Sequence, residues 1–141
     1  METLTQPMNL FWCCFLLHLI ADFNLQGVLA SMKQKCWWCQ QMRDLPPCVH
    51  KLENFDADRY ETDWCAALCC HALMWSLITF GIFMFLVPPL AFSAIVLVNA
   101  TIHAIVDHAK ANAFLINLEE DQLWHLIQIA LTVAVVTLLL K

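Results

Sequence analysis

The chain has 141 residues, of which 61% are hydrophobic and 13% are charged, and its formal net charge is −5 at pH 7. This apolar composition excludes an ordinary soluble domain of the same length and predicts an integral membrane protein. The acidic balance argues against nucleic acid as a partner, since proteins that bind phosphate backbones commonly carry a basic patch.

Four transmembrane helices are predicted, so the expected fold is an all-α, four-helix bundle that forms a single membrane domain over residues 1–141. The first apolar stretch, from Leu10 to Leu29, has Asp22 as its single charged residue. A second stretch, 64–106, has no Asp, Glu, Lys or Arg, and Pro88–Pro89 divides it because prolines remove amide donors and disfavour helix before them. The expected helices cover residues of about 8–31, 64–87, 90–110 and 121–140.

The basic residues predict the orientation of these helices. Most of the Lys and Arg residues lie in the loop of residues 33–63, and Lys110 borders the loop of residues 111–120. Loops that are rich in Lys and Arg stay on the cytoplasmic side of the membrane. We therefore expect both loops to be cytoplasmic and both termini to lie outside.

Three of the predicted helices carry a histidine and an aspartate four residues apart, which places both side chains on one helix face. With the expected orientation, these pairs and one histidine of the second helix fall in the cytoplasmic leaflet. They are His18 and Asp22, His71, His103 and Asp107, and Asp121 and His125. Ionisable side chains within a membrane usually face one another, a cavity or an ion. The sequence therefore predicts that they meet inside the bundle.

Imidazole and carboxylate groups together suit one or two divalent metals, zinc first, with manganese or iron as alternatives. Each aspartate would either bind the metal directly or accept a hydrogen bond from a histidine ligand and so orient its ring. A metal there would lower the pKa of a bound water to about 7, and Lys110 would offer a positive charge to a phosphate or carboxylate. The structural alternative is that each pair only hydrogen-bonds across helices and contributes roughly 0.6–2 kcal/mol to the stability of the bundle.

The loop of residues 33–63 holds a second set of metal-ligand types, Cys36, Cys39, Cys48 and His50. A Cys3His set fits a tetrahedral structural zinc, and residues 36–50 would form the zinc knuckle. The short spacing between Cys48 and His50 is tighter than usual. The alternative is a pair of interfacial tryptophans beside reduced cysteines that bind nothing.

The segments that carry the polar residues resemble a family. They are His18 to Gln26 (HLIADFNLQ), His71, His103 to Lys110 (HAIVDHAK) and Asp121 to His125 (DQLWH). They are similar to the pattern of a domain-of-unknown-function family of small integral membrane proteins found in bacteria and their phages. This resemblance implies a membrane protein of phage or bacterial origin and makes Gln26 and Gln122 candidates for the polar cluster. The expected location is the bacterial plasma membrane. It implies no particular reaction and does not extend to residues 33–63.

The expected function is that of a metal-dependent hydrolase acting on a lipid headgroup or phosphoester at the inner leaflet, with Lys110 and Gln122 contacting the substrate. One alternative is a non-catalytic phage or bacterial protein, active in membrane remodelling, exclusion or defence, whose polar residues fix helix packing. A second is an ion or metal conduit, which the apolar outer halves of the helices disfavour. Membrane lipid is the expected partner; the loop of residues 33–63 could also bind a protein, and a homo-oligomer is left open.

Overall fold

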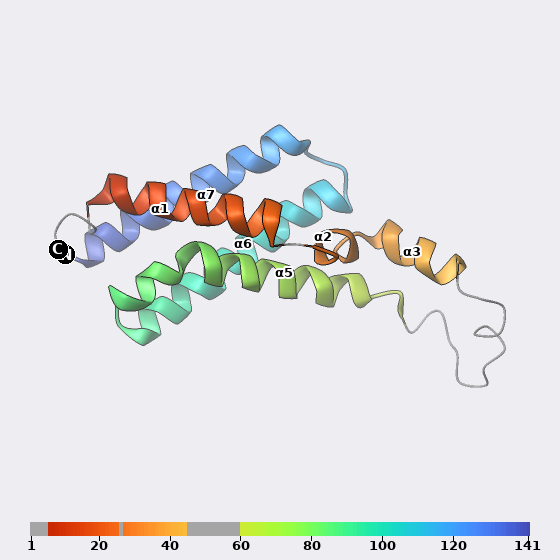
Figure 1. The fold of residues 1–141 in the computed structure, drawn as a ribbon, viewed down its shortest axis with the longest axis horizontal. Coiled ribbons are helices and arrows are strands. Elements are labelled where there is room, and N and C mark those ends of the chain that lie inside the picture. The colour runs from red at the N-terminus through yellow and green to blue at the C-terminus, as the bar shows by residue number, and fades with distance from the viewer. Residues whose placement is uncertain (1–5, 26, 45–59) are drawn as a thin grey trace.

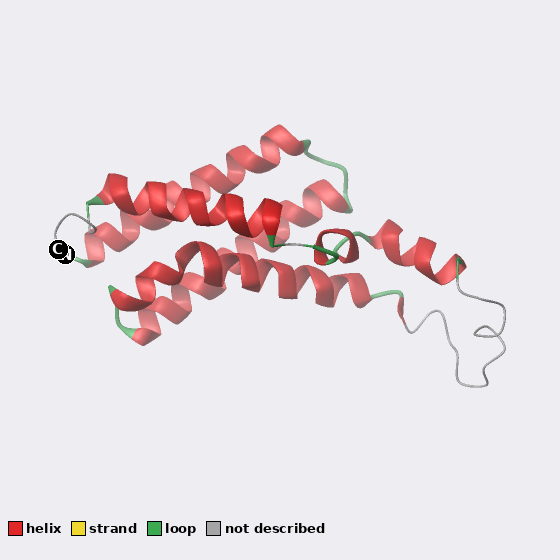
Figure 2. Ribbon diagram, in the orientation of Figure 1, coloured by secondary structure: helices red, strands yellow, loops and turns green. Residues whose placement is uncertain are grey.

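The computed structural model describes residues 6–25, 27–44 and 60–141. Every secondary-structure element in these ranges is helical, which confirms the predicted all-α fold (Figure 2). The elements are α1 (Pro7–Leu19), the π-helix η1 (Ile20–Asn24), α2 (Leu29–Met32), α3 (Lys35–Arg43), α5 (Asp63–Phe80), the 3-10 helix η3 (Gly81–Phe85), α6 (Pro89–Ala111) and α7 (Leu118–Leu139).

Three helices are long and apolar enough to cross a membrane: α5 with η3 over Asp63–Phe85, then α6 and α7. They correspond to the second, third and fourth predicted helices. Pro89 stands in the first turn of α6, where its missing amide breaks no helical hydrogen bond. At the start of α7, Asn117 Oδ1 accepts from the Glu120 amide at 3.0 Å, and Glu120 Oε2 accepts from the Asn117 amide at 2.9 Å. These helices identify the chain as a membrane protein.

The first predicted helix, residues 8–31, is not continuous, and in this respect the prediction was wrong. After α1 the chain passes into η1, where the Leu25 amide donates to the Ile20 carbonyl at 3.0 Å. Gly27, which lies between the end of η1 and the start of α2, adopts a φ of 47°, a left-handed conformation that glycine tolerates. The short helix α2 follows and packs against α5. A run of apolar residues does not reveal such a change in helical geometry.

The long helices lie side by side, with α1 against α5 and α7, and α5 against α6 (Figure 1). The start of α1 and the end of α7 lie at one end of the bundle, and α2 and α3 extend from the other. The first of these ends, here called the apolar end, is filled by buried hydrophobic side chains. Its members are Leu10, Cys14, Phe80, Phe83, Val133 and Val136.

Candidate metal centre

Inside the bundle, toward the end that carries α2, imidazoles and carboxylates from several helices lie together. This group is here called the polar cluster, and its members are His18, Asp22, His71, His103, Asp107, Asp121 and His125. His103, Asp121 and His125 are 0% exposed, and the Asp22 side chain is 7% exposed. Burial of so many ionisable groups is costly unless they are paired or bind an ion.

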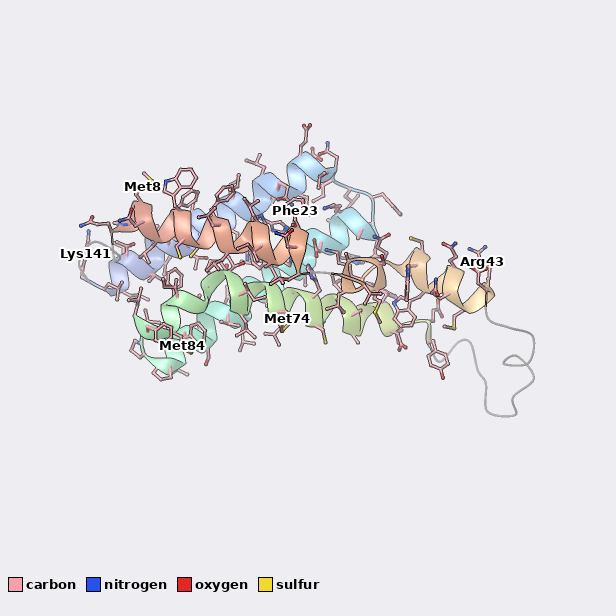
Figure 3. The ribbon with its side chains drawn as sticks, in the orientation of Figure 1. Met8, Phe23, Arg43, Met74, Met84 and Lys141 are labelled. Carbon is pink, nitrogen blue, oxygen red and sulfur yellow. The ribbon has the colours of Figure 1, made fainter. Side chains whose placement is uncertain are left out.

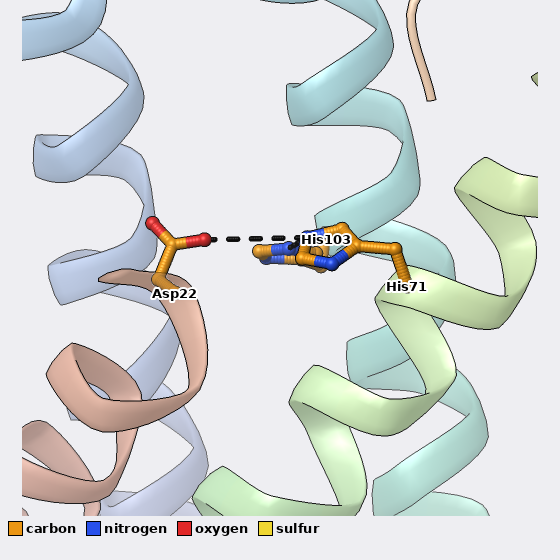
Figure 4. A group of neighbouring side chains, drawn as sticks. All are labelled: Asp22, His71 and His103. Atoms are coloured by element: carbon orange, nitrogen blue, oxygen red, sulfur yellow. Dashed lines mark hydrogen bonds and ion pairs between the residues drawn. The ribbon is translucent and has the colours of Figure 1, made fainter. Parts of the chain in front are cut away.

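One half of the polar cluster is centred on Asp107 of α6. Its Oδ2 lies 3.1 Å from His71 Nε2 of α5 and 3.4 Å from His103 Nε2, one turn earlier on α6. The two imidazole nitrogens are 3.1 Å apart. Asp22 Oδ1 approaches His71 Nε2 at 4.0 Å from η1 (Figure 4). Three elements thus direct ligand-type atoms at one point.

The other half belongs to α7. His125 Nδ1 lies 3.3 Å from His103 Nδ1, and the two rings stack with centroids 4.3 Å apart. Asp121 Oδ1 and His125 Nε2 are 3.4 Å apart, and neither of these buried atoms has a hydrogen-bond partner in the described part of the chain. A buried polar atom left without a partner costs about 1–3 kcal/mol, so each such atom calls for an explanation.

A chain of hydrogen bonds through Trp75, His18 and Gln122 holds the carboxylates of Asp22 and Asp121 in place. Trp75 Nε1 donates to His18 Nδ1 at 2.9 Å, and His18 Nε2 lies 3.1 Å from Gln122 Oε1. Because an indole only donates, His18 accepts at Nδ1 and carries its proton on Nε2, which donates to Gln122. Gln122 Nε2 in turn donates to Asp22 Oδ2 at 3.0 Å and to Asp121 Oδ2 at 3.1 Å. Both ring nitrogens of His18 are therefore already in use.

Two lysines offset part of the negative charge of the polar cluster. Lys33 Nζ donates to Asp107 Oδ2 at 2.7 Å and lies 3.3 Å from His71 Nε2. Lys110 Nζ donates to Asp121 Oδ2 at 2.6 Å. Each lysine thus engages one carboxylate, while Asp22 is held by Gln122 and approaches His71.

Three sets of side chains within the described residues could each hold a metal ion, because their ligand atoms lie within 4.8 Å of one another. The sets are Asp22, His71 and His103; His103, Asp107 and His125; and Asp22, Asp121 and His125. Asp22 belongs to two sets that otherwise have no common member. Of the seven predicted ligands within the bundle, His18 is the one that belongs to none of these sets.

The predicted site residues fall into different positions. Lys110 reaches the polar cluster through Asp121, and Gln122 is committed to holding carboxylates in place. Cys36 and Cys39 lie on α3 and are exposed, with Cys36 Sγ 3.6 Å from Gln34 Oε1. The remaining predicted members of the zinc knuckle, Cys48 and His50, lie outside the described residues, as does Gln26.

Two residues of the site were not predicted. Trp75 stacks on His103 with centroids 4.0 Å apart and an interplanar angle of 12°. Trp75 could have been predicted, because it lies four residues after His71 and therefore on the same helix face. Lys33 gave no such signal, because the break after η1 separates it from the pattern of the first helix.

Comparison with models of protein families, with curated proteins and with solved structures finds no match to the chain.

Proposed function

We propose that the protein is a membrane-embedded, metal-dependent hydrolase that acts on a lipid headgroup or a phosphoester at the inner leaflet. Its metal centre would be a pair of divalent ions held by Asp22, His71, His103, Asp107, Asp121 and His125. Zinc suits this nitrogen and oxygen donor set, and manganese or iron would also fit. His18, Trp75 and Gln122 would position the ligands.

The observation that carries this proposal is the pair of orphaned atoms at the start of α7. Asp121 Oδ1 and His125 Nε2 are buried, face each other at 3.4 Å and have no hydrogen-bond partner among the described residues. A cation between them would satisfy both atoms at once. The third member of their ligand set is Asp22, which also belongs to the set of His71 and His103. Two ions bridged by one carboxylate are common in hydrolases of phosphate esters.

Bound metal would polarise a phosphoryl oxygen and lower the pKa of a water molecule, which supplies the nucleophile at neutral pH. Hydrolysis then joins the oxygen of water to phosphorus and breaks the bond between phosphorus and the alcohol oxygen. The alcohol takes up one proton, so the reaction needs no co-reactant besides water. The lysines would lie near the charge that develops on the phosphoryl oxygens, where fixed positive groups lower the barrier.

We also propose that α1 with η1 forms a fourth span and that both loops face the cytoplasm of a bacterium. Along α1 and η1, large apolar side chains are exposed at intervals of three or four residues, as on a lipid-facing surface. They are Met8, Trp12, Leu16, Ile20 and Phe23. Met8 projects outward from the bundle, as Met74 does from α5 (Figure 3). The resemblance to small membrane proteins of bacteria and phages supports the plasma membrane as the location.

Elemental analysis of detergent-purified protein, combined with an assay of phosphate release from phosphatidic acid, tests the proposal. The variants are His103→Ala/His125→Ala, which removes two ligands from the polar cluster, and Cys36→Ser/Cys39→Ser, which removes two from the loop. We expect the first variant to lose metal and hydrolysis together. The second should retain the metal of the polar cluster and the activity.

A wild-type protein without metal after exposure to zinc and manganese would refute the proposal. Metal that is lost only from the cysteine variant would refute it as well, because the bundle would then hold none. Circular dichroism of each variant shows whether the helices are intact, so loss of metal is separated from loss of fold.

The second candidate is a non-catalytic membrane protein whose polar cluster fixes helix packing. The ion pairs of Lys33 with Asp107 and of Lys110 with Asp121 favour it, since they neutralise two of the carboxylates without a metal. It predicts a stable, metal-free protein that hydrolyses nothing. An ion conduit is disfavoured by the apolar end of the bundle, where the buried side chains are hydrophobic.

A further inference from the structure

A cavity of about 360 Å³ opens beside the polar cluster. It lies where η1, α2, the end of α6 and the start of α7 meet, and Asp22 and Asp107 form part of its wall. A molecule in this cavity would touch Asp22 and Asp107, which between them belong to all three ligand sets. The cavity is therefore a direct approach to the candidate metal centre.

Two ammonium groups line this cavity. The Lys33 side chain is 9% exposed and comes from the end of α2, whereas Lys110 is 31% exposed and comes from α6. Burial of a lysine is costly, and pairing with one carboxylate offsets the cost only in part. Two lysines in the wall of one cavity favour a ligand that carries negative charge.

The backbone around Lys33 is held by Asn112, which follows the last turn of α6. Asn112 Nδ2 donates to the Lys33 carbonyl at 3.0 Å, and Asn112 Oδ1 accepts from the Lys35 amide at 2.7 Å. These two bonds fasten the chain after α2 to α6, across the break that follows η1. These hydrogen bonds thus fix the backbone position of Lys33 beside the cavity.

The net charge around the cavity depends on whether metal is bound. Without metal, Asp22, Asp107 and Asp121 outnumber the two lysines by one negative charge. A single divalent ion reverses this sign, and a second makes the site more positive. Anion binding in the cavity should therefore require bound metal.

The edge of the cavity is apolar. Phe23, Phe114 and Leu118 line it and are 58%, 79% and 55% exposed. Phe114 has a φ of 56°, a left-handed conformation that is strained for a bulky residue and that persists where the surrounding structure enforces it. An apolar edge around a charged cavity suits an amphiphile whose phosphate enters first.

We propose that this cavity binds the phosphate group of a phosphorylated amphiphile, with Lys33 and Lys110 as its cationic contacts. This inference rests on the proposed function and narrows its substrate class to phosphate esters. The phosphate group could belong to a lipid or to a soluble ester, and the apolar edge favours the lipid.

Calorimetric titration of detergent-purified, metal-loaded protein tests this assignment. One arm uses inorganic phosphate, and the other uses short-chain phosphatidic acid. The variants Lys33→Gln and Lys110→Gln should each weaken binding of both probes by about ten- to a hundredfold, the usual effect of losing a hydrogen bond to a charged group. Lys35→Gln is the matched control, since Lys35 lies nearby and its ammonium group forms an exposed ion pair with Glu61. It should leave both affinities unchanged.

Tighter binding of phosphatidic acid than of phosphate identifies the lipid as the source, and equal binding identifies a soluble phosphate ester. Metal-loaded wild type that binds neither probe, or lysine variants that bind like Lys35→Gln, would overturn the assignment. Metal content is measured in the same samples. Protein without metal contradicts the proposed function, whereas metal-loaded protein without phosphate binding contradicts the assignment of the cavity alone. Lys33→Arg, which keeps the charge, should restore binding if Lys33→Gln is poorly folded.

Discussion

The polar cluster and the apolar end are both buried in the same bundle, yet they are built in different ways. At the apolar end, side chains such as Phe83 and Val136 need only fill space. In the polar cluster, nearly every donor has its acceptor, but Asp121 Oδ1 and His125 Nε2 remain unsatisfied within the described residues. One end contributes stability by packing, whereas the other retains an energetic cost that a bound cation would remove.

This difference implies that stability and metal binding are separable by mutation. Substitutions at the apolar end should lower the free energy of unfolding and leave the metal content of the folded protein unchanged. Substitutions in the polar cluster should change metal content first. The following predictions test this separation.

The largest effect is expected for Asp22→Asn. Because Asp22 belongs to two ligand sets, loss of its charge should remove about half of the metal or more and abolish hydrolysis. Elemental analysis and the phosphate-release assay measure both effects. Glu119→Gln, an exposed change on α7, is the control. Full metal content in Asp22→Asn would show that the Asp22 carboxylate is not a ligand shared by two metal ions.

Phe83→Ala should lower the free energy of unfolding by about 3–5 kcal/mol, because a fully buried ring is replaced by a cavity. Metal per folded molecule should not change. Unfolding by SDS in mixed micelles measures the loss. Phe85→Ala is the matched control on η3, since its ring is 78% exposed. Loss of metal in Phe83→Ala under folding conditions would mean that the two regions are coupled.

Trp75→Phe keeps an aromatic ring beside His103 but removes the donor to His18. Since that bond begins the chain that orients Asp22 and Asp121, metal affinity should fall by about ten- to a hundredfold. Competition with a coloured chelator measures the affinity. Trp124→Phe, at an exposed position on α7, should bind metal as wild type does. Equal metal affinities in the two variants would show that Trp75 does not position the metal ligands.

Asn117→Ala should have the smallest effect, a loss of about 1 kcal/mol of stability, because it removes the capping box of α7. Asn117→Ser keeps a capping oxygen and should recover most of the loss. Neither variant should alter the metal content. A change in metal content would mean that the start of α7 must be capped to present Asp121.

Much of the site follows from spacing along the chain. Pairs four residues apart, such as His103 with Asp107, predict a shared helix face, and hydropathy places the faces in one bundle. Hydropathy does not reveal the π turn of η1 or the left-handed conformation of Gly27. The packing of α2 against α5 and the burial of Lys33 could therefore not be predicted. The roles of His18 and Gln122 depend on which atoms meet across helices, and spacing contains no information about that.

X-ray absorption at the metal edge of the purified Cys36→Ser/Cys39→Ser protein tests the central claim most directly, because the exposed thiols of α3 are then absent. The account predicts nitrogen and oxygen ligands at about 2.0–2.2 Å, as for zinc with imidazole and carboxylate, and a second metal about 3.5–4 Å away. A spectrum dominated by sulfur, or a sample without metal, would contradict it.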